Sequence, residues 1–167
     1  NYYNTDSLQI DQSAFTMDDL LILFSMGNDG VDANMNGEID MALLNPQATA
    51  KNSLSVGASE NFRCDLYSKT WGWFDSVTAG TKWPSAPIED DLMACEIEGV
   101  AAISNRGPTE DGRIKPDLVA PGTYIVSARS QDDFDGDGEP VTYGLGYPGG
   151  SSDYYAYNTG TSMATPL

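Results

Sequence analysis

The sequence has 167 residues, of which 40% are hydrophobic, and this is enough for one globular domain with a buried core. Its 25 acidic residues against 8 basic ones give a net charge of −17 at pH 7. Such a surface repels nucleic-acid phosphates, so we expect no nucleic-acid partner. There is no apolar run of about 18 residues, so we expect no membrane span.

The first predicted element is a helix within residues 1–19. Any of the capping residues at 5–7 (Thr, Asp, Ser) can start it, and Ile10, Ala14 and Met17 recur at helical spacing. This spacing predicts an apolar stripe that packs on the core.

A run of five apolar residues at 20–24 predicts a strand buried on both faces, as in a parallel sheet. A Ser-Met-Gly-Asn-Asp-Gly stretch follows it directly. Ligands of open α/β sheets collect at the carboxyl ends of strands, so Asn28 is a candidate site residue. On its own, Gly-Asn-Asp-Gly is more often a plain turn.

Residues 32–43 have part of a calcium-loop pattern. Oxygen side chains alternate at Asp32, Asn34 and Asn36, and Gly37 takes the sixth position. The twelfth position is Leu43, where such loops carry a bidentate glutamate. Both a calcium site and a polar surface loop are therefore open interpretations.

A second acidic segment, rich in glycine, spans about residues 131–154. Asp133, Asp135 and Asp137 alternate there, but the twelfth position is Gly144. Carboxylates this close repel one another unless a cation or water screens them. Calcium and a solvated loop again remain alternatives.

Between these loops, residues 53–60 alternate like a strand, and residues 61–98 interrupt the pattern. These residues hold three tryptophans, and we interpret 61–98 as an insertion that packs its own small aromatic cluster on the main domain. A long surface loop is the alternative. Residues 98–122 then predict a strand, a Gly-Pro turn, a hairpin-like excursion and a second strand stopped by Pro121. Residues 124–128 predict one more strand.

The final stretch, residues 158–166, is a turn of small residues that delivers Ser162 at the start of a helix. A nucleophilic serine needs this setting, because a tight turn exposes the hydroxyl and glycine lets another backbone approach. The helix start also favours developing negative charge. Gly-Thr-Ser alone could equally be an ordinary capping turn.

The full string Gly-Thr-Ser-Met-Ala-Thr-Pro closely resembles the nucleophile motif of subtilisin-like serine proteases, the subtilases. The stretch ending in Asn28 resembles their oxyanion segment. Residues 98–122 resemble the block between these motifs, with Asn105 where the family usually has serine. The resemblance is nearest to large secreted bacterial-type subtilases and covers about two-thirds of the chain.

This resemblance implies an α/β fold of three layers with a mostly parallel central sheet. It implies a serine endopeptidase in which Ser162 attacks the peptide carbonyl and the Asn28 amide stabilises the oxyanion. The implied substrate-binding residues are Ser25, Met26, Gly27, Gly160 and Thr161.

One departure from the family is large: the chain contains no histidine. The family's aspartate and histidine precede the serine in the sequence, as does the other wall of the specificity pocket. We therefore expect this chain to be an internal piece of a catalytic domain, inactive alone and partnered by its N-terminal remainder. The alternative is a calcium-dependent binding or structural module that has lost catalysis, which the absence of upstream Asp-Gly and His-Gly-Thr motifs would favour.

The only two cysteines, Cys64 and Cys95, bracket the insertion, and related enzymes are secreted. A disulfide between them, in an extracellular or secreted protein, is the prediction that follows. Two buried free thiols are the alternative.

Overall fold

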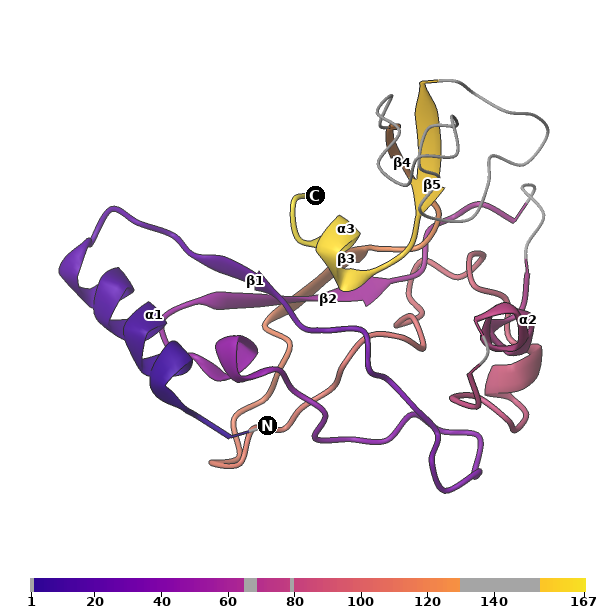
Figure 1. The fold of residues 1–167 in the computed structure, drawn as a ribbon, viewed down its shortest axis with the longest axis horizontal. Coiled ribbons are helices and arrows are strands. Elements are labelled where there is room, and N and C mark those ends of the chain that lie inside the picture. The colour runs from indigo at the N-terminus through magenta and orange to yellow at the C-terminus, as the bar shows by residue number, and fades with distance from the viewer. Residues whose placement is uncertain (1, 65–68, 79, 130–153) are drawn as a thin grey trace, which may run out of the picture.

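The computed structural model describes residues 2–64, 69–78, 80–129 and 154–167, and it has a mixed α/β fold (Figure 1). A parallel sheet is formed by β1 (Leu23–Ser25), β2 (Leu54–Ser59) and β3 (Leu118–Pro121), in that order. The antiparallel pair consists of β4 (Ile125–Ala128) and β5 (Tyr155–Asn158). The α-helices are α1 (Thr5–Thr16), α2 (Trp71–Val77) and α3 (Thr161–Ala164). Two 3-10 helices, η1 (Pro46–Thr49) and η2 (Ile88–Asp90), complete the elements.

The central strand β2 organises the sheet, because β1 and β3 both pair with it in parallel. Its residues from Ser55 to Ser59 are buried, and α3 packs against it. In Figure 1, α3 lies above the sheet and η1 below it. The fold is thus the layered α/β arrangement with a parallel sheet that the sequence predicted, over the part of the chain described.

The prediction of a doubly buried strand at 20–24 is wrong in position and in burial. The strand is Leu23–Ser25, and Leu21 is 64% exposed. Among the described residues β1 pairs only with β2, so it is an edge strand with one open side. A run of apolar residues alone cannot distinguish an edge strand from a central one.

The predicted apolar stripe of α1 is also wrong, because the helix docks through polar residues. Asn4, one residue before the predicted caps, caps the helix by accepting from the Asp6 and Ser7 amides. The buried residues of the helix are Ser7 and Asp11, whereas Met17 lies beyond its end and is exposed. The Asp11 carboxylate accepts from the main-chain N–H groups of Lys51 (2.8 Å) and Asn52 (2.7 Å). This contact ties α1 to the chain that leads into β2.

Of the two strands predicted within residues 98–122, the structure forms only the second. Residues 100–105 form turns rather than a strand, with one isolated bridge between Ser59 and Val100. The second predicted strand is present as β3. Just before it, Lys115 binds Asp117 (2.6 Å), whose carboxylate also accepts from the Ser55 amide (2.7 Å). The polar residues of this block therefore attach β3 to β2.

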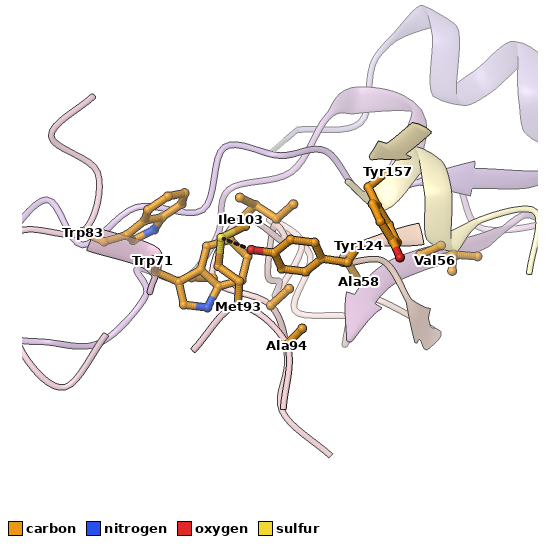
Figure 2. Close-up of a cluster of buried hydrophobic side chains, with 12 residues drawn as sticks. Val56, Ala58, Trp71, Trp83, Met93, Ala94, Ile103, Tyr124 and Tyr157 are labelled. Carbon is orange, nitrogen blue, oxygen red and sulfur yellow. Dashed lines mark hydrogen bonds between the residues drawn. The ribbon is translucent and has the colours of Figure 1, made fainter. Parts of the chain in front are cut away.

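Residues of the insertion at 61–98 pack an aromatic cluster, as predicted (Figure 2). Trp71, Phe74 and Trp83 contact one another, and both tryptophans are almost fully buried. Trp73 lies outside this cluster, beneath the ammonium of Lys69. Figure 2 shows the cluster continuing through Met93 to tyrosines at 124 and 157. The insertion thereby shares one core with the sheet.

The predicted disulfide between Cys64 and Cys95 is present. The acidic loop at about 131–154, with Asp133, Asp135 and Asp137, lies outside the described residues except for Tyr154. Of the described helices, none combines the length and the apolar character needed to cross a membrane.

The docking of α1 predicts the effect of an Asp11→Ala substitution. The change leaves two main-chain N–H groups without their acceptor, so the free energy of unfolding should fall by about 1–3 kcal/mol. Urea denaturation measures this. Asp18→Ala, an exposed aspartate just past the same helix, is the control and should change the free energy by less than about 0.5 kcal/mol. Equal effects of both variants would refute the docking role.

Candidate active site

The site is assembled by a contact between Asn28, which follows β1, and Thr161, which begins α3. The Asn28 side-chain oxygen accepts from the Thr161 amide (2.8 Å) and from the Thr161 hydroxyl (2.9 Å). Because an amide N–H can only donate, the carboxamide oxygen must face Thr161. The carboxamide nitrogen therefore points away from the Thr161 amide and hydroxyl, and it has no acceptor among the described residues.

The main chain on both sides of Asn28 is held in place. The Gly27 main-chain N–H donates to the Thr161 hydroxyl (3.2 Å), and the Gly27 carbonyl accepts from the main-chain N–H of Asn105 (3.1 Å). The Asn105 side chain accepts from the Asp29 amide (2.6 Å). Asn105 is 1% exposed, so this bridge lies in a dry environment where hydrogen bonds are strong.

Ser162 follows Thr161 in the first turn of α3 and is exposed. Before it, the Gly160 amide donates to the Gly122 carbonyl (2.8 Å), which anchors the turn at the end of β3. Ser162 borders a hollow of about 430 Å³ against β4 and β5. A second hollow joins it to Ser25 and Phe24 of β1. The hydroxyl is thus open to a ligand.

Asn28 borders a different hollow of about 310 Å³. Its lining includes Thr159 from the turn before Ser162, and Asp75, Lys82 and Trp83 from the insertion. A chain of substrate lying across the Thr159–Ser162 turn could therefore contact both hollows.

The five predicted substrate-binding residues occupy three kinds of position. Ser25 lines a hollow together with Ser162. Gly160 passes close to Asn28, since a Cβ built on it would lie 3.3 Å from the Asn28 amide nitrogen. The other three are buried, and they are Met26, Gly27 and Thr161. Thr161 and Gly27 are hydrogen-bonded to each other, and Thr161 also binds Asn28, whereas Met26 packs against Leu44 and Ala48.

Two residues near Asn28 were not predicted as site residues from the sequence. Lys82 lies 54 positions away, inside the insertion, and its ammonium donates to the Asn28 carbonyl (3.0 Å). Asn105 stands where the resemblance expects serine, and its carboxamide makes the bridge to Asp29 described above. The departure at Asn105 was the one signal that could have pointed to this role.

The loop at 32–40 is held by its own hydrogen bonds. The two Asp32 oxygens accept from the Asn36 and Gly37 amides, both at 2.9 Å. Asn34 donates to Asp40 (3.0 Å) and accepts from the Asn36 amide (3.0 Å). In the described part of the chain, no group of three acidic, cysteine or histidine side chains is arranged to hold a metal. Calcium at Asp32, Asn34 and Asn36 stays a prediction.

The subtilase family's sequence profile matches residues 2–167. This chain belongs to the subtilase family. That result agrees with the resemblance of its motifs.

Three relatives show how far the similarity extends. The serine protease/ABC transporter B family protein tagD of Dictyostelium discoideum is 32% identical over 211 residues, and tagB of the same organism is 28% identical over 208. Each alignment covers 99% of this subtilase chain but only 10% of the relative. Serine protease AprX of Bacillus subtilis is 37% identical over 79 residues, covering 47% of this chain and 16% of AprX. The chain therefore spans about a tenth of the first relatives, and a specific likeness to secreted bacterial subtilases stays a prediction.

The packing of Gly27 gives a stability prediction with a matched control. Gly27 and Gly112 both have left-handed backbones, with φ of 104° and 82°. A Cβ at Gly27 would collide with the side chains of Asn45 and Asn105, whereas a Cβ at Gly112 would meet nothing within 4 Å. Gly112→Ala should cost about 1–2 kcal/mol of unfolding free energy from backbone strain alone. Gly27→Ala should cost about 1–3 kcal/mol more from overpacking, measured by thermal and urea unfolding. Equal costs would show that Asn45 and Asn105 do not confine Gly27.

The calcium prediction is tested by thermal unfolding. If residues 32–40 bind the ion, excess calcium should raise the melting temperature relative to a chelator, because a ligand that binds only the folded state stabilises it. Asn34→Ala removes one predicted ligand and should shrink the difference. A melting temperature that is the same in calcium and in chelator would remove this loop as a calcium site.

Proposed function

We propose that this chain supplies the nucleophile and the oxyanion-stabilising side chain of a serine endopeptidase. Ser162 attacks the carbonyl carbon of the scissile peptide bond. The carbonyl oxygen gains negative charge, and the Asn28 amide nitrogen donates a hydrogen bond to it. The asparagine of subtilisin is the standard example of this effect, worth about 10²–10³ in turnover.

One observation supports this proposal above the others: Thr161 holds the oxygen of the Asn28 carboxamide. A carboxamide that is free to rotate would present its oxygen to the oxyanion half of the time, and the oxygen would repel it. The two hydrogen bonds from Thr161 remove that orientation. They also fix Asn28 to the residue next to Ser162, so nucleophile and donor share one support.

The general base must come from polypeptide outside this sequence. The chain has no histidine, and in the described part of the chain the Ser162 hydroxyl has no side-chain hydrogen-bond partner. We propose that the preceding part of the same protease domain provides the aspartate and histidine. The serine proton then moves to that histidine and later to the leaving amine.

We also propose that the protein works outside the cell or in a secretory compartment. The disulfide between Cys64 and Cys95 supports this, because such bonds persist in oxidising surroundings. Its substrates are polypeptides.

The proposal predicts how a serine-directed fluorophosphonate reacts. The full-length protease should be labelled at Ser162 and should hydrolyse fluorogenic peptides, whereas the 167-residue chain alone should do neither, because its base is absent. Asn28→Ala in the full-length protein should lower kcat by about 10²–10³. It should also lower the melting temperature, because the Thr161 amide and hydroxyl lose their acceptor, so kcat is measured well below that temperature. Ser162→Ala should lower kcat further.

Asn52→Ala is the control for the Asn28 substitution, since the Asn52 side chain is exposed and distant from the site. It should leave kcat unchanged. Rapid labelling of the isolated chain would show that the general base lies within this chain and not outside it. A full-length protein that carries the upstream aspartate and histidine yet is neither labelled nor active would refute the proposed function.

A further inference from the structure

The insertion does more than cover the core, because its residues 82 and 83 form hydrogen bonds with the segment that follows Asn28. The Asp32 amide donates to the Lys82 carbonyl (2.8 Å), and the Trp83 indole donates to the Gly30 carbonyl (3.2 Å). The Lys82 ammonium donates to the Asn28 carbonyl (3.0 Å). Trp83 is 2% exposed, so these contacts rest on a rigid base.

We propose that Lys82 is a positioning residue for oxyanion stabilisation by Asn28. This inference rests on the proposed proteolytic function and adds to it a residue that the insertion provides. Lys82 acts in two ways: its hydrogen bond fixes the Asn28 main chain, and its positive charge favours negative charge on the oxygen that the Asn28 amide receives.

The first action completes a set of restraints on the main chain around Asn28. Thr161 and Asn105 bind the two polar groups of Gly27, and Asn105 binds the Asp29 amide. The Asn28 carbonyl is a further polar group of this stretch, and its partner is the Lys82 ammonium. An oxyanion donor is effective when it is already oriented before the charge develops, so restraint of this carbonyl contributes to the rate.

The second action follows from the charges nearby. Asp29 is the next residue in the chain, and Asp75 lines the same hollow as Asn28 and Lys82. Both carboxylates oppose an oxyanion, in a protein whose net charge is already −17. The Lys82 ammonium is the cation among the residues that line this hollow. It offsets the two carboxylates where the transition state becomes negative.

Kinetics of the full-length protease test the role. Lys82→Met should lower kcat about three- to tenfold with little change in KM, because the hydrogen bond and the charge act in the transition state. Lys82→Arg should retain most of the activity. Lys69→Met is the matched control, since Lys69 belongs to the same insertion but lies over the Trp73 ring. Its kcat should equal that of the wild type.

Inhibitors separate this role from a structural one. A peptide boronic acid forms an anionic tetrahedral adduct with serine, so its affinity should fall by the same factor as kcat in Lys82→Met. A neutral, non-cleavable peptide of the same sequence should bind both proteins equally. The melting temperature is measured for each variant, and a merely structural lysine would weaken both ligands together.

A double-mutant cycle gives the deciding result. If Lys82 positions Asn28, Lys82→Met should lower kcat by a smaller factor in an Asn28→Ala background than in the wild type, because only its direct charge effect on the oxyanion remains there. Equal factors in both backgrounds, or an unchanged kcat in Lys82→Met, would overturn the inference while leaving the proposed function standing. A wild-type enzyme without hydrolysis or labelling would overturn the proposed function, and this inference with it.

Discussion

The geometry of the site depends on the two hydrogen bonds that Thr161 gives to the Asn28 carboxamide oxygen. They join the end of β1 to the beginning of α3 and decide which atom of the carboxamide remains available. The Thr161 hydroxyl also accepts from the Gly27 amide, so this one buried side chain joins the Gly27 main chain to the Asn28 side chain. Threonine suits this place because it offers a donor and an acceptor on a short, stiff side chain.

The surrounding structure holds the contact between Thr161 and Asn28 in place. Asn105 reaches from the block before β3 and binds the chain on both sides of Asn28, while Lys82 and Trp83 approach from the insertion. The start of α3, the block that contains Asn105 and the insertion are distant in sequence, and all three contact the short segment that follows β1. The aromatic cluster of Figure 2 unites the insertion with the sheet, so the support of Asn28 is continuous with the main core.

The sequence was informative where a local motif determines local geometry. The turn before Ser162, the strand at β2 and the position of Asn28 after a strand follow from short-range patterns, and the disulfide follows from the presence of only two cysteines. The sequence was uninformative where contacts with distant residues determine the structure. Whether residues 20–24 are buried depends on neighbouring strands, and the polar docking of Asp11 depends on main-chain groups 40 positions away. Lys82 could not be found for the same reason, since nothing in its own surroundings in the sequence marks a contact with Asn28.

The bond between Thr161 and Asn28 joins residues 133 positions apart. Contacts of such long range form late, because most of the intervening chain must first be ordered. On the ribosome, Asn28 emerges long before Thr161, and Ser162 is made after every other described part of this site. Chain order therefore means that Asn28 cannot be held in the orientation described above until all the other described residues around it have been made.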